Sequence, residues 1–284
     1  MTAVAFAWHR PKAIEEAVDA LATHGRDAAL LAGGGSLAIL LNERAVRPPH
    51  VIDLNQIDEL AGIRDEGERV WIGAMTRVFD VESSEPLGDR LPLLPACART
   101  VADPSLRHRV TVGGGLGYAD SSGSLPTALL ALDSTVHAAG PRGARDIPID
   151  ELFVAAHETS LAPDELITGV TVPVPPAGAG TAWLDLDRRH LAYSLVSAAA
   201  VVEPRNGGIG RAGVAMAGIA PTPRRLRAVE RALDSTDEAG VRRAAARAVD
   251  DADPIGDMHA SVDFRRRMAV EFSARAVLEA ISRW

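Results

Sequence analysis

Two glycine triplets about eighty residues apart are the residues of this chain whose type and spacing most directly suggest chemistry. The first lies in AGGGS, from Ala32 to Ser36, and the second in TVGGG, from Thr111 to Gly115. Each follows a short run typical of a β-strand. Because glycine has no Cβ, such turns let several backbone N–H groups line a concave surface that binds phosphate. A single glycine triplet is also common in ordinary turns that bind no ligand. Two triplets in one chain predict a diphosphate that is held from both sides.

The first triplet also fits a dinucleotide fingerprint, which leaves a second cofactor class open. Gly33-x-Gly35-x-x-Ala38 follows a predicted strand and opens a predicted helix, and Asp53 stands twenty residues after Gly33. This pattern suggests an NAD(P)-binding Rossmann-type oxidoreductase with Asp53 on a ribose. Against it, the next segment does not continue as regular βαβ units, and the second triplet has no role. We therefore favour Asp53 as a turn residue at the end of a strand.

Composition excludes several classes of partner and site. The formal net charge of -8 argues against nucleic acid or an anionic membrane surface, since both attract basic faces. No apolar run is long enough to span a membrane and no cleavable signal opens the chain, so we expect a cytoplasmic protein. Cys97 is the only cysteine, which excludes an internal disulfide and an iron–sulfur cluster ligated by this chain alone. The eight histidines show no metal-ligand spacing, so no metal site is predicted.

Apolar spacing predicts two small α/β units in the first 175 residues. Residues 12–24 have helical spacing, AALLA and HVIDL are typical of strands, and SLAILLNERA is typical of a helix, so a first unit closes near residue 57. Residues 58–175 contain the predicted strands ERVWIGAM and DELITGVTVP and the predicted helix PLLPACARTVA.

The last third of the chain has a different order of elements. Pro173–Gly180 is rich in proline, glycine and alanine and marks the expected domain boundary. Beyond it, TAWLDLDRR, YSLVSAAAVVE and RAGVAMAGI have the pattern of strands in an antiparallel sheet. Two helices are predicted to close the chain, one around TPRRLRAVERAL and one from Asp263 to Trp284. We expect a C-terminal α+β domain over residues 176–284.

With both glycine turns in place, the chain resembles the FAD-binding medium subunits of the molybdenum hydroxylases, such as that of carbon monoxide dehydrogenase. It is also similar to the central flavin domain of xanthine dehydrogenase. The matching segments keep their order: LLAGGGSLAILL, HVIDLNQIDELAGI, VWIGAMTR, ARTVADPSLRHRVTVGGGLGYADSSGSLPTALLALD, GIAPTPRRLRAVERAL and DMHASVDFRRRMAVEFSARAVLEA. The resemblance implies an α+β fold with an FAD-binding domain of two small α/β subdomains, about 1–57 and 58–175. A C-terminal domain of antiparallel sheet and helices follows, and FAD lies between them.

The resemblance also assigns roles to individual residues. The first triplet would wrap the diphosphate through backbone amides, Thr111 would donate its hydroxyl to a phosphate, and Val101 and Ile167 would lie beside the cofactor. Without the resemblance, Val101 and Ile167 fit plain core positions and Asp120 fits an Asx turn. The implied FAD-binding residues are Ala32, Gly33, Gly34, Gly35, Ser36, Leu37, Val101, Thr111, Gly113, Gly114, Gly115, Asp120, Ser124, Ile167 and Tyr193.

Four positions depart from the family pattern. Gly115 stands where the family usually has Asn, Ser124 where it often has Asp or Glu, Leu184 where a Lys sometimes lies near the flavin, and Ala192 where an Asp precedes YSLVS. Each departure removes a side-chain hydrogen bond worth about 0.5–1.5 kcal/mol. A flavin-free scaffold subunit of the same complex therefore stays an alternative.

The resemblance further implies that this chain works inside a larger enzyme. A large subunit with the molybdopterin cofactor would hydroxylate the substrate, and [2Fe–2S] clusters on a small subunit would carry electrons to FAD. The assembly implied is a dimer of heterotrimers, and the acceptor a quinone, oxygen or a nicotinamide. No residue of this chain is predicted to act as an acid, base or nucleophile, and the substrate pocket is expected on another chain.

Overall fold

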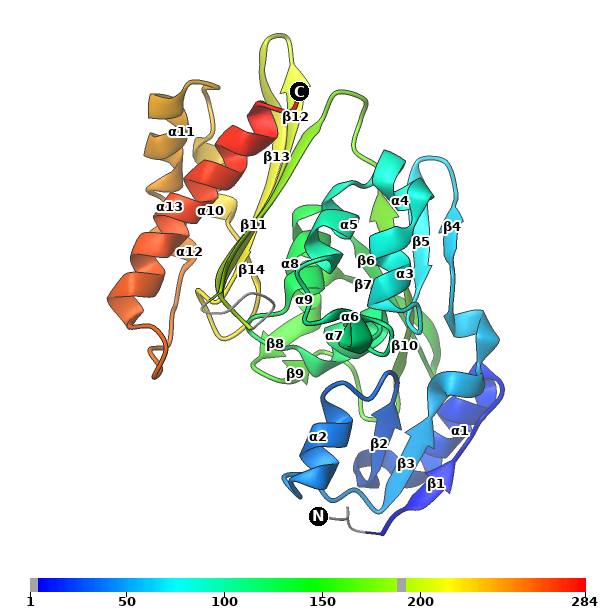
Figure 1. Cartoon of the computed structure of the whole chain (residues 1–284). Helices are drawn as coiled ribbons and strands as arrows, with labels where there is room; N and C mark the ends of the chain where they lie inside the picture. The colour runs from blue at the N-terminus through cyan, green and yellow to red at the C-terminus, as the bar shows by residue number, and fades with distance from the viewer. Residues whose placement is uncertain (1–4, 188–192) are drawn as a thin grey trace.

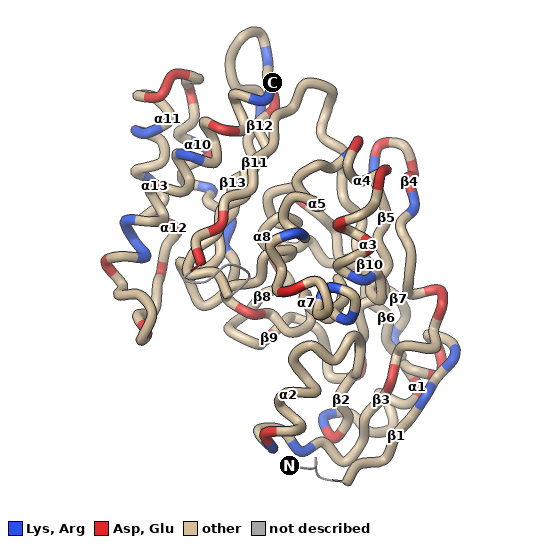
Figure 2. The backbone as a smooth tube through the Cα atoms, viewed as in Figure 1, with Lys and Arg blue, Asp and Glu red and all other residues tan. Residues whose placement is uncertain are grey.

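In the described part of the chain, three larger β-sheets with covering helices follow one another along the molecule, and a two-stranded hairpin forms a fourth, small sheet (Figure 1). The computed structural model describes residues 5–187 and 193–284. Acidic and basic residues are interspersed over all three units (Figure 2). Within the described ranges, no helix has the length and apolar content needed to cross a bilayer.

The N-terminal unit is a parallel sheet in the order β1-β3-β2. The helix α1 (Ile14–His24) covers this sheet. Its apolar residues Ala17, Val18 and Leu21 lie on one side and pack in one buried cluster with Ile52 of the middle strand. This burial explains the helical spacing of apolar residues in the segment 12–24. The elements are β1 (Ala7–His9), α1 (Ile14–His24), η1 (Gly25–Asp27), β2 (Ala28–Leu31), α2 (Leu37–Asn42), β3 (His50–Asp53), η2 (Leu54–Gln56) and η3 (Asp58–Leu60).

The middle unit is an antiparallel sheet in the order β4-β5-β10-β6-β7. Its strands are β4 (Ile63–Asp65), β5 (Arg69–Gly73), β6 (Thr135–Gly140), β7 (Gly143–Pro148) and β10 (Leu166–Pro173). A short hairpin, β8 (Phe153–Ala155) and β9 (Glu158–Thr159), stands apart from it. The helices are α3 (Val78–Ser83), α4 (Glu85–Arg90), α5 (Leu93–Ala98), α6 (Pro104–Arg107), α7 (Val112–Tyr118), α8 (Ser124–Ala131) and α9 (Ile149–Leu152).

The C-terminal unit is an antiparallel sheet in the order β11-β12-β13-β14, buried on both faces. Alternate residues of its second strand explain this, because Ala199 and Val201 belong to the core of the middle unit whereas Ala198 and Ala200 pack with the last helices. The strands are β11 (Gly180–Asp187), β12 (Ser194–Arg205), β13 (Gly208–Ala217) and β14 (Arg224–Arg225), and the helices are α10 (Arg227–Ala232), α11 (Glu238–Ala245), α12 (Ala248–Asp251) and α13 (Val262–Ile281).

The structure confirms the α+β class and corrects two local expectations. The run RVTV before the second glycine triplet is not a strand, since only an isolated bridge joins Thr111 to Arg77, and the triplet itself lies in α7. Thr111 caps that helix by accepting a hydrogen bond from the N–H of Gly114, and this local bond outweighs the β-propensity of the residues before it. Four helices rather than two close the described part of the chain.

Candidate functional site

The two glycine segments meet in the structure, as the diphosphate hypothesis requires. A Cβ on Gly33 would lie 1.8 Å from the carbonyl oxygen of Arg109, and a Cβ on Gly35 would lie 2.4 Å from Cγ1 of Val110. The first glycine loop therefore packs directly against the backbone that leads into the second triplet. These two positions require glycine because the protein approaches itself there.

The first loop carries unused hydrogen-bond donors. The backbone N–H groups from Gly33 to Leu37 donate to no acceptor among the described residues, whereas the carbonyls of Gly34 and Ser36 accept the first bonds of α2. Gly34 turns the chain with a φ of +72°. Free N–H groups that precede and open a helix attract anionic oxygen, because they add to the positive end of the helix dipole.

The second segment differs, because its N–H groups are already bonded inside the protein. Val112 donates to the carbonyl of Thr76 at 3.0 Å, Gly113 to the carbonyl of Ala74 at 2.8 Å, and Gly115 to the carbonyl of Thr111 at 3.0 Å. The Thr111 hydroxyl accepts from Gly114 and still has a hydrogen to donate. A Cβ on Gly115 would meet nothing within 4 Å, so this position faces open space.

A pocket of about 410 Å³ lies beside the first loop, and polar residues from three elements brace it. Arg77 donates to the carbonyl of Arg109 at 2.6 Å and to Oδ1 of Asn55 at 2.6 Å, and Asn55 in turn donates to the carbonyl of Ala32 at 2.8 Å. Arg77 and Arg109 both line the pocket, and their guanidinium groups stay charged at neutral pH. The pocket is therefore suited to an anion.

Sequence reasoning gave no role to these bracing residues. Asn55 and Arg77 lie inside the segments HVIDLNQIDELAGI and VWIGAMTR, which carry the family resemblance. No sequence motif links either residue to the glycine triplets, so nothing in the sequence was a reason to place them at the site. Asn55 lies in η2 and Arg77 is the N-cap residue of α3, and their hydrogen bonds to Ala32 and to each other bring them to the glycine loop.

Asp53 is a turn residue, as expected from the sequence. Its carboxylate accepts from the backbone N–H of Asn55 at 3.0 Å and from the Asn55 side chain at 2.6 Å, which caps η2. The residue is 6% exposed. A side chain bonded and buried in this way is not presented to a ribose, and the three-stranded sheet around it does not continue as a Rossmann unit.

A group of tyrosines and an aspartate lies beyond the far end of α7. Burial and the nearby Asp120 carboxylate raise the pKa of Tyr118, while an interaction with Ser36 opposes them. Partial desolvation, together with the charges of Asp120 and Tyr118, also raises the pKa of Tyr193, a side chain that is 75% exposed. Asp120 accepts from the N–H and the hydroxyl of Ser122 and so forms an Asx turn.

The remaining expected positions lie around this group. Ile167 on β10 packs at 4.0 Å from where a Cβ on Gly117 would stand, next to α7. Val101 packs against the core of the middle unit, and Ser124 is the first residue of α8. Among the described residues, neither Val101 nor Ser124 forms a hydrogen bond with a residue of the two glycine segments.

The departures from the family pattern fall into two groups in space. Gly115 and Ser124 lie on α7 and α8 of the middle unit, whereas Leu184 packs against the C-terminal core. Ala192 lies outside the described residues. Cys97 is fully buried, as expected of a small apolar side chain.

Two family models match the chain in sequence order. The FAD binding domain in molybdopterin dehydrogenase matches residues 4–175, and the CO dehydrogenase flavoprotein C-terminal domain matches residues 182–280. Curated relatives match over almost their whole length. The 6-hydroxypseudooxynicotine dehydrogenase complex subunit alpha of Paenarthrobacter nicotinovorans is 37% identical over 95% of this chain and 92% of that protein. The carbon monoxide dehydrogenase medium chain of Hydrogenophaga pseudoflava is 36% identical over 98% of each chain.

Solved structures agree with the sequence matches. A chain of the Hydrogenophaga pseudoflava carbon monoxide dehydrogenase superposes with a TM-score of 0.97 at 36% identity, covering 100% of this chain and 99% of that one. A chain of quinoline 2-oxidoreductase from Pseudomonas putida 86 superposes with a TM-score of 0.93 at 28% identity, covering 99% of each. The order of domains, the paired glycine segments and these matches agree, and the chain belongs to the family of FAD-binding medium subunits of molybdenum hydroxylases.

Proposed function

We propose that the loop from Ala32 to Leu37 holds the diphosphate of FAD and that this subunit relays electrons from the iron–sulfur clusters of a partner to an external acceptor. One observation carries the placement: five successive N–H groups, from Gly33 to Leu37, have no acceptor within the described chain. A buried or half-buried N–H group is rarely left without a partner. A diphosphate supplies acceptors with the charge that these donors favour.

The residues around the loop fit an FAD diphosphate. Arg77 and Arg109 add positive charge to the pocket, the Thr111 hydroxyl keeps a hydrogen to donate, and Gly115 leaves open space at α7. FAD, when bound, supplies the redox chemistry, because it accepts electrons and passes them on. This chain supplies binding, orientation and charge. Gly113, Gly114, Asp120, Ser124, Val101, Ile167 and Tyr193 remain in the proposed site as the residues that surround the cofactor.

We divide the chain at residue 175 in this proposal. Residues 1–175, with subdomains of about 1–57 and 58–175, would form the FAD-binding domain, and residues 176–284 the C-terminal domain. The matches of the two family models to 4–175 and 182–280 support this division.

The partners proposed are a molybdopterin-binding large subunit and a [2Fe–2S] small subunit in a dimer of heterotrimers, in the cytoplasm. Relatives are named as medium chains or as subunits of dehydrogenase complexes, which supports a multi-subunit enzyme. Cys97 is the only cysteine, so the electrons must reach the chain from elsewhere.

The test is to purify the tagged chain from its native host and to analyse its partners and cofactor. We expect a large and a small subunit to copurify and one FAD per chain to appear after acid denaturation and chromatography. FMN, a nicotinamide or no cofactor in the intact complex would overturn the cofactor proposal. A lone chain that oxidises a small organic substrate with its own FAD would overturn the proposed division of labour.

A further inference from the structure

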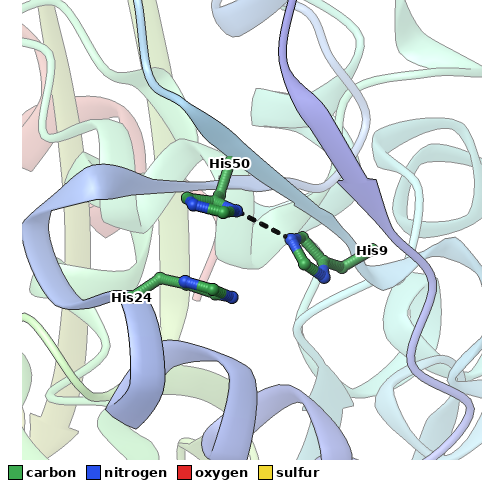
Figure 3. A group of neighbouring side chains, drawn as sticks. All are labelled: His9, His24 and His50. Atoms are coloured by element: carbon green, nitrogen blue, oxygen red, sulfur yellow. Dashed lines mark hydrogen bonds between the residues drawn. The ribbon is translucent and has the colours of Figure 1, made fainter.

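Three histidines that are far apart in the sequence gather on one face of the first sheet (Figure 3). His9 ends β1, His24 ends α1, and His50 begins β3. Nε2 of His9 lies 3.0 Å from Nδ1 of His50 in a hydrogen bond. The rings of His24 and His50 stack with centroids 3.7 Å apart. One nitrogen from each ring can be chosen so that all three lie within 4.8 Å of one another.

This group is separate from the proposed flavin pocket. Trp8 lines that pocket, and because successive side chains of a strand point to opposite faces, the neighbouring His9 points to the other face of the sheet. The register agrees, since Ala7 pairs with His50 and therefore His9 and His50 share a face. The helix α1, whose last residue is His24, reaches the same face.

We propose that His9, His24 and His50 form a binding site for one divalent transition metal ion of the zinc class. Nothing in the flavin chemistry uses these residues. Three imidazoles on three different elements are a common ligand set for zinc, and they leave a fourth position for water. Imidazole nitrogen also suits copper and nickel, whereas it does not suit magnesium or calcium.

The surroundings of His24 are compatible with metal binding. Metal binds the neutral form of imidazole. Burial and the neighbours His50 and His9 lower the pKa of His24, and only Asp27 opposes them. The lowered pKa favours the neutral form of the His24 ring, which is the form that binds a metal ion.

The spacing of the nitrogens suits an ion, and the rings must reorient to accept it. At Zn–N distances of about 2.0–2.1 Å, tetrahedral ligand nitrogens are about 3.3 Å apart, and the His9 and His50 nitrogens are 3.0 Å apart. The proton in their hydrogen bond must move to the opposite nitrogen of the same ring, so that both facing nitrogens offer a lone pair. The stacked rings of His24 and His50 must tilt so that both lone pairs point to the same ion.

The test measures metal binding by the untagged, chelator-treated complex, because a polyhistidine tag would itself bind the ion. Zn²⁺ is titrated calorimetrically into the parent and into His9→Ala, His24→Ala and His50→Ala. His259→Ala is the matched control, since His259 is exposed and lies in the C-terminal unit. We expect one Zn²⁺ per chain in the parent and the control, and an affinity at least about 100-fold lower in each of the three variants.

A second measurement keeps the proposal testable if one variant folds poorly. Co²⁺ should give visible bands of tetrahedral coordination in the parent, and Zn²⁺ should raise the melting temperature of the parent but not of His24→Ala. FAD content should stay at the parent level in His24→Ala, which separates this site from the flavin site. Unchanged Zn²⁺ affinity in the three variants, or no saturable binding by the parent below about 1 mM, would overturn the proposal.

Discussion

Replacing Gly115 by asparagine should tighten FAD binding. Gly115 is an exposed residue in α7, beside the first glycine loop, and a side chain there meets nothing within 4 Å. The family that the chain resembles usually has asparagine at this place. If the open space is where the cofactor lies, the new amide supplies one neutral hydrogen bond of about 0.5–1.5 kcal/mol. The dissociation constant of FAD should therefore fall by about 2- to 10-fold.

The assay is fluorescence titration of the flavin-depleted chain with FAD, together with circular dichroism and urea unfolding. Asparagine has a better helix propensity than glycine by a few tenths of a kcal/mol, so stability should rise slightly. Gly88→Asn is the matched control, because Gly88 is also an exposed helical glycine with nothing within 4 Å. The control should gain the same stability and leave FAD affinity unchanged.

A third variant, Gly115→Val, distinguishes the effect of the new hydrogen bond on FAD affinity from the effect of the added side-chain volume. Valine has a similar volume but offers no donor or acceptor, and its branched Cβ narrows the open face, so FAD should bind more weakly than to the parent. Equal FAD affinity in the parent, Gly115→Asn and Gly115→Val, with native spectra, would remove Gly115 and its open face from the proposed site.

Two ion pairs and the buried cysteine allow three further predictions. Arg225→Met should lower the free energy of unfolding in urea by about 2–4 kcal/mol, because it removes a buried guanidinium that bonds Oδ1 of Asp133 at 2.6 Å and also pairs with Glu230, while Asp133 keeps its ion pair with Arg211; an unchanged midpoint would contradict this. The Arg145 side chain lowers the pKa of Glu165, so this ion pair stabilises the fold at neutral pH and its contribution is lost as the pH falls below about 4.5. Glu165→Gln should flatten that acid slope. Burial raises the pKa of Cys97, so its thiol should react with a disulfide reagent only after unfolding.

Regular elements with one clear period were predictable from the sequence. The strand pattern of LITGVTVP and the helical spacing of residues 12–24 appear as β10 and α1, because each buries one periodic set of side chains against a neighbour. The hairpin strand β7 (Gly143–Pro148) was not predicted, since five of its six residues are exposed and its sequence GARDIP carries no apolar alternation. Its place is fixed by pairing with β6, which no local pattern reveals.

The part of the proposed site that consists of consecutive glycines could be predicted from the sequence, whereas the part that depends on contacts between residues far apart in the chain could not. Three consecutive glycines marked the first loop in the sequence. In the structure, the backbone N–H groups from Gly33 to Leu37 donate to no acceptor among the described residues. Arg77 and Asn55 reach the loop only because separate elements fold beside it. The histidine group shows the same limit, since His9 and His50 are 41 residues apart and meet only through the pairing of β1 and β3.

Glycine is needed for different physical reasons at different positions of the two triplets. Gly33 and Gly113 are glycine because a Cβ would collide with the protein itself, at 1.8 Å from a carbonyl oxygen in one case and 2.5 Å from the Cβ of Ala74 in the other. The close approach at Gly33 lets the first loop pack against the backbone of Arg109 and Val110, and the close approach at Gly113 lets α7 pack against Ala74. The N–H groups from Gly33 to Leu37 donate to no acceptor in the described part of the chain. Only Gly115 has open space around it. Gly33 therefore serves packing, and we propose that the unbonded N–H groups beside it bind the diphosphate of FAD.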